Sequence, residues 1–282
     1  MTSAVAEFPR ARDAAELKDM ARLLRLDVLD VTAKVGGHVS SCFSCVEVLT
    51  AIYFGGVLNY RPEQPGWPQR DRFILSKGHA APVFYPVLAR AGYAPLDTLK
   101  EFRTLRAGLH GHPIAYAYPG VESTSGSLGQ GLSFGLGTIL AARLSKADYH
   151  TFVMLGDGEC QEGQIWEAAM AAAHWKADRL HAIVDHNKYQ QTGPIEREMS
   201  FAPFAAKWEA FGWRVFECDG HDLEALVANM MAMRAVERQP SILIAHTVKG
   251  KGVSFVEKDY GMHGRNLSPE QDRLAREEIR CL

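Results

Sequence analysis

Short apolar runs alternate along this chain with longer segments whose apolar residues recur at helical spacing. Five of the runs have strand length and cover residues 71–76, 151–155, 180–184, 213–218 and 241–248. Helical spacing is found at 80–91, 128–144, 164–175, 203–211 and 223–238. This alternation is typical of an α/β fold, here a doubly wound, mainly parallel sheet flanked by helices. Because the sequence has no internal repeat and no break in composition, we expect a single domain over residues 1–282.

Both ends of the chain add helices to this pattern. A broad apolar stripe predicts a helix over 11–35, and a second helix is expected over 45–54; each stops at a Gly-Gly pair. We expect these helices, within residues 1–60, to pack on the flank of the sheet. Near the other end, Ser268 with Gln271 behind it has the pattern of a capping box, which predicts a short charged helix over 268–280.

The strongest candidate for chemistry lies within residues 152–193. Its two apolar runs enclose an Ala-rich helix, so it reads as a strand–helix–strand unit with parallel strands. Asp157 follows the first strand and Asn187 follows the second, at the sheet edge where parallel strands bind ligands. Carboxylate and amide oxygens beside a helix N-terminus suit a magnesium ion that carries a diphosphate. Alone, Gly156-Asp157-Gly158 also fits an ordinary turn in which Asp caps the helix.

Four histidines follow structural breaks and sit next to glycine or proline: His38, His79, His112 and His263. A single loop histidine is commonly a solvated surface group, but these four share the Asp157 edge as a common focus. His110 and His112 also form a His-x-His pair. A zinc site would need at least one more ligand, and the spacing offers none.

Three other motifs fit structural roles better than functional ones. Cys42 and Cys45 form a Cys-x-x-Cys, but no strand precedes them, so we interpret them as small core residues on one helix face. Residues 131–135 match the Gly-x-Ser-x-Gly pattern of serine hydrolases, yet they lie within helical spacing. The glycines of this stretch also imitate a dinucleotide fingerprint, again with no preceding strand. A glycine-rich helix packed closely on the sheet accounts for both patterns.

Composition narrows the class of protein further. A net charge of −2 leaves no electrostatic footprint for nucleic acid or an anionic membrane surface. The first twenty residues have no apolar block of the kind a secretory signal needs, and no run approaches the roughly 18 apolar residues of a membrane span. Five scattered cysteines do not form a disulfide framework. We therefore expect a cytoplasmic protein.

Several segments, in order along nearly the whole chain, resemble the transketolase family. They are Gly37-His38, residues 71–79 (DRFILSKGH), Gly111-His112-Pro113, residues 119–131 (PGVESTSGSLGQG), residues 156–163 (GDGECQEG), residues 249–252 (KGKG) and His263-Gly264. Their order is similar to that of the N-terminal, thiamine-diphosphate-binding half of transketolase. The Ser- and Cys-rich helix start after His38 resembles the split-gene bacterial form, in which two short chains replace one long chain.

The resemblance implies roles for individual residues. Magnesium would be held by Asp157, the Asn187 side chain and the Tyr189 carbonyl. The diphosphate or pyrimidine side of thiamine diphosphate would be contacted by His79, Gly126, Ser127, Leu128, Gly158, Asn187 and His263. A sugar substrate would be hydrogen-bonded, and its proton transfers assisted, by His38, His112 and His263. Glu162 resembles the acid that, in the family, communicates between paired cofactor sites.

Some family features are altered or missing. His38 is followed by Val39 rather than proline, Ser127 replaces a common proline, His186 stands where Asp or Asn is usual, and Ile114 leaves the sugar specificity open. In the family, the glutamate that protonates the aminopyrimidine, the aromatic residue stacked on it and the arginines for sugar phosphate lie in a following half. The 282 residues do not contain that half.

We therefore expect the N-terminal subunit of a two-chain transketolase that transfers a two-carbon ketol unit from a ketose (phosphate) to an aldose (phosphate). It would use thiamine diphosphate and Mg²⁺ and be inactive without a separate C-terminal, pyrimidine-binding subunit, with which it would form a heterotetramer. Alternatives are a subunit of another thiamine-diphosphate enzyme, similar to deoxyxylulose-phosphate synthase or a 2-oxo-acid dehydrogenase alpha chain, and a non-catalytic thiamine-diphosphate-binding protein. The histidine set favours sugars over 2-oxo acids.

Overall fold

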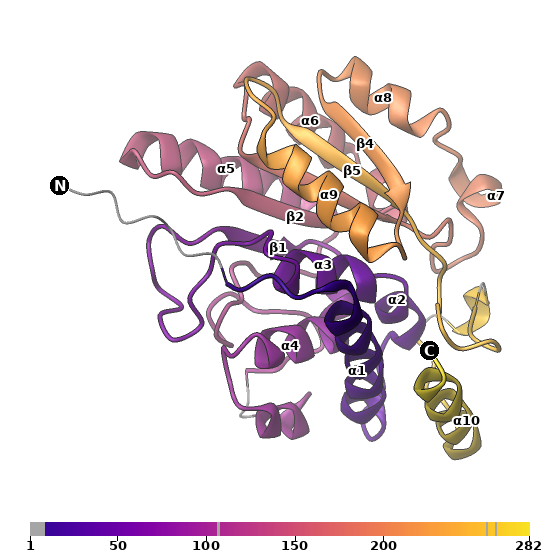
Figure 1. The fold of residues 1–282 in the computed structure, drawn as a ribbon. Helices are drawn as coiled ribbons and strands as arrows, with labels where there is room; N and C mark the ends of the chain where they lie inside the picture. Colours follow the sequence, from indigo (N-terminus) through magenta and orange to yellow (C-terminus); the bar gives the residue numbers. More distant parts are fainter. Residues whose placement is uncertain (1–8, 106–107, 258, 263) are drawn as a thin grey trace.

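A parallel five-stranded sheet forms the centre of the molecule (Figure 1). The computed structural model describes residues 9–105, 108–257, 259–262 and 264–282. The strands are β1 (Arg72–Leu75), β2 (Thr151–Gly156), β3 (Leu180–His186), β4 (Arg214–Asp219) and β5 (Ser241–His246). They lie in the order β1-β2-β3-β5-β4, and every neighbouring pair is parallel. All five carboxyl ends therefore meet at one edge, which confirms the predicted α/β sheet.

Successive residues of the central strands enter different cores. Phe152 and Met154 of β2 belong to one apolar cluster, whereas Val153 and Leu155 belong to another. Side chains alternate between the two faces of a strand, so a strand that is apolar at every position must be covered on both faces. Helices supply that cover, which gives three layers.

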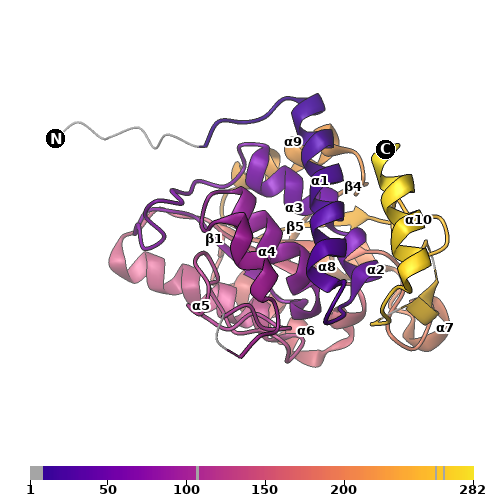
Figure 2. The same cartoon turned by 90° about the horizontal axis from the view of Figure 1, so that it is seen from below.

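The first core is enclosed by helices from both ends of the chain: α1 (Ala14–Thr32), α2 (Val39–Phe43), α3 (Val46–Phe54), α4 (Ala81–Arg90), α9 (Leu223–Arg234) and α10 (Pro269–Arg280). Every residue of α3 is buried, because α1, α4 and α9 all pack against it. Figure 2 shows α10 beside α1, where Arg276 Nη1 lies 2.7 Å from Asp30 Oδ1. The segment within residues 1–60 therefore contributes to the main core of this layer.

Helices from the middle of the chain cover the opposite face: α5 (Gln130–Ser145), α6 (Gly163–His174) and α8 (Phe204–Ala210), with Ile195 of the short α7 (Ile195–Met199). Single-turn 3₁₀ helices lie at η1 (Gly78–Ala80), η3 (Gly158–Gln161) and η4 (Tyr260–Met262), and a longer one at η2 (Leu96–Glu101). In the described residues no helix is both long enough and apolar enough to cross a membrane.

Most predicted elements are confirmed, with ends shifted by a few residues. The predicted capping box at Ser268 is present: Ser268 Oγ accepts from the Gln271 amide at 3.2 Å, and Gln271 Oε1 accepts from the Ser268 amide at 2.9 Å. The helix start expected after His38 forms a separate short helix, α2, and the short helix α7 was not predicted. The extent of the domain over residues 1–282 stays a prediction.

Candidate functional site

The predicted acid and amide meet at the carboxyl edge of the sheet. Asp157 follows β2 and Asn187 follows β3, and the paired residues Gly156 and Asp185 hold the two strand ends level. Both side chains line a cavity of about 400 Å³. The cavity is lined by nine of the predicted site residues: His38, His79, His112, Gly126, Leu128, Asp157, Gly158, Asn187 and Tyr189.

Three predicted site residues are not placed in that lining. Ser127 and Glu162 are exposed, although their neighbours Leu128 and Gln161 do line the cavity. Glu162 lies against Gly129, since a Cβ added at Gly129 would come within 2.9 Å of the Cβ of Glu162. His263 lies outside the described residues. The roles of all three stay predictions.

Asp157 is a buried carboxylate surrounded by backbone donors. Its Oδ1 accepts from the Gly158 amide at 2.7 Å, and its Oδ2 accepts from the Lys188 amide at 2.5 Å. Lys188 has a φ of 68°, in the left-handed region, and this turn brings its N–H back toward the end of β2. Burial, reinforced by the nearby Asp185 carboxylate, raises the pKa of Asp157 to about 7. A cation in this cavity would stabilise the ionised form.

Asn187 presents its amide oxygen toward the same turn. Its Nδ2 donates to Asp185 Oδ2 at 3.1 Å and lies 3.4 Å from Ser44 Oγ. Because these neighbours need a donor, the end of the amide that faces them is the nitrogen. Its Oδ1 accepts from the Tyr189 amide at 3.1 Å. The amide oxygen of Asn187 and the carboxylate of Asp157 therefore lie at neighbouring strand ends, with the backbone of Tyr189 beside them.

A buried hub beneath the cavity was missed by the sequence reasoning. Asp185 accepts hydrogen bonds from Lys77, from Thr247, from Ser44 Oγ at 2.6 Å and from Asn187. Burial alone would raise the pKa of Asp185, but the Lys77 ammonium and these hydrogen bonds hold it below its ordinary value. The available signal was an acid inside an otherwise apolar strand, since a carboxylate is rarely fully buried unless it is paired.

A second buried acid joins the glycine-rich loop to the sheet. Glu159 accepts from Ser76 Oγ, from the Gly129 amide at 2.9 Å and from the Gly156 amide at 3.0 Å. An added Cβ at Gly131 would lie 2.4 Å from Ser76 Cβ, so the start of α5 approaches β1 too closely for a side chain. Gly131 thus has a packing role. Ser133 lies inside α5, which follows a loop rather than a strand, so the match to the serine-hydrolase motif has no catalytic meaning. The interpretation of this stretch as a glycine-rich packed helix is confirmed.

Three histidines converge above the cavity. The ring centroid of His38 lies 5.4 Å from that of His79 and 6.5 Å from that of His112. Burial, helped by the nearby charges of His112 and Arg103, lowers the pKa of His38 to about 4. Burial and Arg103 also lower the pKa of His112. Both rings are therefore neutral at pH 7, and each offers one N–H donor and one acceptor.

The remaining candidate motif is structural. Cys42 and Cys45 are both buried and unlinked. Burial raises the pKa of the Cys45 thiol to about 12, which removes the thiolate that redox chemistry needs. The expectation that both lie on one helix is wrong, because Cys42 belongs to α2 whereas Cys45 caps α3.

Fold and site together define a parallel α/β domain with a ligand cavity at the carboxyl edge of its sheet, and comparisons with known proteins identify its family. Residues 14–280 match the family described as "Transketolase, thiamine diphosphate binding domain". The chain belongs to that family.

Similar proteins include subunits of about this length. An apulose-4-phosphate transketolase subunit from Phocaeicola vulgatus is 40% identical over 270 residues, which cover 95% of this chain and 94% of that protein. The 6-deoxy-6-sulfo-D-fructose transketolase subunit SqwG of a Clostridium species is 38% identical over 265 residues, covering 94% of this chain and 96% of that protein.

Solved transketolases share the fold. A Pichia stipitis transketolase mutant superposes with a TM-score of 0.85 and 30% sequence identity, and the match covers 94% of this chain and 40% of that one. The Campylobacter jejuni transketolase gives a TM-score of 0.85 with 28% identity, covering 94% of this chain and 42% of that one. The chain thus spans nearly all of the similar subunits and under half of these solved transketolase chains.

Proposed function

We propose that this chain is the cofactor-anchoring subunit of a two-chain transketolase, which transfers a two-carbon ketol unit from a ketose or its phosphate to an aldose or its phosphate. The observation that carries the proposal is the meeting of Asp157, Asn187 and the histidines His38, His79 and His112 around one cavity. The agreement in length between this chain and transketolase subunits supports the two-chain arrangement.

The residues present fit thiamine diphosphate held through Mg²⁺. Asp157 offers a buried carboxylate, Asn187 an amide oxygen and Tyr189 a backbone carbonyl, which are the hard oxygen donors that Mg²⁺ prefers. The raised pKa of Asp157 marks a carboxylate that a cation would stabilise. Gly126 and Gly158 line the cavity without side chains, so a diphosphate could approach the backbone closely there.

The bound cofactor supplies the carbon nucleophile and the electron sink for breaking and forming the carbon–carbon bond. The residues of this chain anchor and orient. His38 and His112, both neutral, hydrogen-bond sugar hydroxyls and accept or return a proton at a ring nitrogen. Their convergence favours a polyhydroxylated substrate over a 2-oxo acid. His79 and His263 act on the diphosphate side, and His263 also faces the sugar.

A second chain completes the site in this proposal. It supplies the groups that handle the aminopyrimidine and the substrate phosphate, and two copies of each chain form a heterotetramer in the cytoplasm. Ser127 lies beside the pyrimidine and Glu162 at the contact between paired sites, consistent with their exposure.

Purification of the tagged chain from its native cell, followed by assay of ketol transfer over a panel of ketoses and aldoses with thiamine diphosphate and Mg²⁺, tests the proposal. We expect no transfer by the isolated chain, transfer after the co-purifying chain is added, and loss of transfer after chelation. Full activity of the isolated chain would contradict the two-chain arrangement. Failure to bind thiamine diphosphate in the presence of Mg²⁺ would contradict the site.

A further inference from the structure

The loop that follows β5 is held by hydrogen bonds to two side chains, His221 and Arg25. The backbone N–H of Val248 donates to His221 Nε2 at 2.8 Å. Three residues later, the carbonyl of Lys251 accepts from Arg25 Nε at 3.0 Å. Between these two points, the Gly250 amide donates to the Ser40 carbonyl at 3.0 Å. The backbone of residues 248–251 is therefore fixed along its length.

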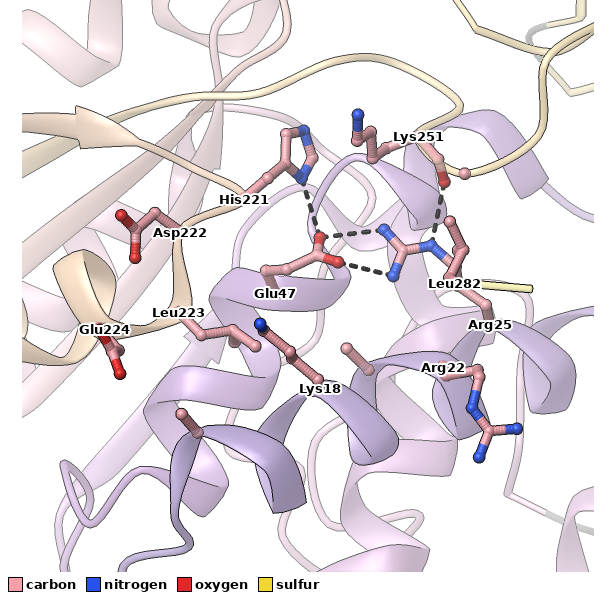
Figure 3. Close-up of a pocket in the computed structure, with 13 residues that line it drawn as sticks. Lys18, Arg22, Arg25, Glu47, His221, Asp222, Leu223, Glu224, Lys251 and Leu282 are labelled. Carbon is pink, nitrogen blue, oxygen red and sulfur yellow. Dashed lines mark hydrogen bonds and ion pairs between the residues drawn. The ribbon is translucent and has the colours of Figure 1, made fainter. Parts of the chain in front are cut away.

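A single buried carboxylate organises both anchors (Figure 3). Glu47 Oε1 accepts from Arg25 Nη1 at 2.6 Å, and Glu47 Oε2 lies 3.0 Å from Arg25 Nη2 and 2.9 Å from His221 Nδ1. Because a backbone N–H can only donate, His221 Nε2 must be the unprotonated nitrogen, so Nδ1 carries the hydrogen and donates to Glu47. Glu47 thus selects the tautomer of His221 that can accept from Val248. We call Arg25, Glu47 and His221 the Glu47 bracket.

The loop held by the bracket carries two buried groups close to the acids of the cofactor site. Thr247 donates to Asp185, the acid that also contacts Asn187. Lys249 is 1% exposed; burial and the Lys77 ammonium lower its pKa to about 8, and the carboxylates of Asp157 and Asp185 partly offset this effect. The turn that carries His221 packs directly on this loop, since an added Cβ at Gly220 would lie 2.3 Å from Thr247 Cγ2. The bracket is therefore connected to the cavity through a short, closely packed piece of backbone.

We propose that the Glu47 bracket is a positioning device that sets Lys249 at the diphosphate site, with His221 as its key positioning residue. The inference rests on the proposed function, because it takes Lys249 as a cation that faces the diphosphate. His221 itself touches neither cofactor nor substrate. It acts by fixing the Val248 amide, and with it the backbone direction from which the Lys249 side chain departs.

The bracket is reachable from solvent. A separate cavity of about 530 Å³ is lined by Arg25, Glu47, His221, Lys251 and nine other residues (Figure 3). Removing the imidazole of His221 would leave a space that opens into this cavity. Free imidazole can enter there and replace the missing ring, so the proposal allows a chemical-rescue test.

The test measures binding of inorganic pyrophosphate with Mg²⁺, and of thiamine diphosphate with Mg²⁺, to the full chain by calorimetry. We expect His221→Ala to weaken both affinities by at least about tenfold, as when one charge-assisted contact is disordered. Added imidazole should restore them. Lys249→Met should weaken them similarly without rescue, and the double variant should be no weaker than Lys249→Met alone.

Asp222→Ala is the matched control. Asp222 neighbours His221 and lines the same cavity, but its carboxylate accepts from the Ala225 amide at 3.0 Å and caps α9. This variant should lower stability with pyrophosphate affinity unchanged. Equal weakening by Asp222→Ala and His221→Ala, unchanged affinity in His221→Ala, or fully additive effects of His221→Ala and Lys249→Met would each overturn the proposal.

Hydrogen exchange separates this proposal from the proposed function. In His221→Ala, amide exchange should accelerate in residues 248–251 and slow again when imidazole is added, with or without cofactor. If the wild-type chain binds neither pyrophosphate nor thiamine diphosphate, the proposed function fails, whatever the exchange shows. If the wild type binds both and exchange in this loop is unchanged by His221→Ala, the bracket proposal fails and the proposed function stands.

Discussion

The buried pair of Lys77 and Asp185 supports a quantitative prediction about the floor of the cofactor cavity. Both side chains are almost completely buried, 1% exposed for Lys77 and 0% for Asp185. Removing one partner of such a pair costs about 3–5 kcal/mol, because the remaining charge has no compensation. The cost depends on what else stabilises the remaining group, and here the two partners differ.

Asp185→Asn leaves the Lys77 ammonium with neutral acceptors, such as the Ser41 carbonyl at 3.2 Å from its Nζ, and removes its opposite charge. Lys77→Met leaves Asp185 with three neutral donors, those of Ser44, Thr247 and Asn187. We therefore expect Asp185→Asn to lower the free energy of unfolding by about 3–5 kcal/mol, a large share of the roughly 5–15 kcal/mol of a typical domain. Lys77→Met should cost less. The double variant should cost less than the sum of the two single variants.

Urea unfolding of the purified chain without cofactor, followed by tryptophan fluorescence, measures all four stabilities of this double-mutant cycle. The slope with denaturant must stay constant for the comparison to hold. Two results would refute the reasoning: effects of the single variants that simply add, or a smaller loss for Asp185→Asn than for Lys77→Met. Additive effects would mean that the two buried charges are not energetically coupled. The reversed ranking would mean that the remaining hydrogen-bond partners do not decide the cost of losing one charge.

Three further predictions concern the cavity, the sheet and the pH dependence. Asp157→Ala should abolish Mg²⁺-dependent retention of thiamine diphosphate on a desalting column while circular dichroism stays unchanged; normal retention would count against the assigned ligand. Gly131→Ala should lower the free energy of unfolding by about 1–3 kcal/mol in urea, since its Cβ would overlap Ser76; an unchanged midpoint would contradict the close packing. Burial holds the pKa of His150 at about 4 and that of His181 well below its ordinary value. Both rings are neutral in the folded protein, whereas in the unfolded chain they take up protons below about pH 6.5. As the pH is lowered below that value, the free energy of unfolding should therefore fall by up to about 1.4 kcal/mol per pH unit for each ring. Urea melts between pH 7 and 5 that are flat would argue against this, and His150→Asn should reduce the slope.

Sequence patterns were most informative where a segment is buried on both faces. The runs 152–155 of β2 and 182–184 of β3 are apolar at every position because helices cover both sides, and such runs can be recognised without a template. Polar residues follow each run within a few positions, which is why Asp157 and Asn187 were considered together. Motif resemblance then brought His38, His79 and His112 into the same site, as the cavity lining shows.

What sequence could not supply are contacts between distant segments and the directions of loop side chains. Asp185 is the hub of the cavity floor, but its partner Lys77 lies 108 positions away, and no local pattern links them. The Glu47 bracket depends on a similar meeting of three separate segments. Ser127 and Glu162 belong to motifs whose neighbours line the cavity, yet both are exposed and are not part of the lining, because motif membership does not fix the position of each side chain.

The strand β2 is held in place from two directions at once, with Phe152 fitted into one core and Val153 into the other. Loss of a single residue from this strand would exchange the two sets of side chains and draw Asp157 back by about 3.3 Å. The packing of β2 in the two cores therefore fixes the distance at which Asp157 emerges from the sheet. Insertions and deletions should accordingly not be tolerated within this strand, and should be tolerated only in the loops beyond the carboxyl edge.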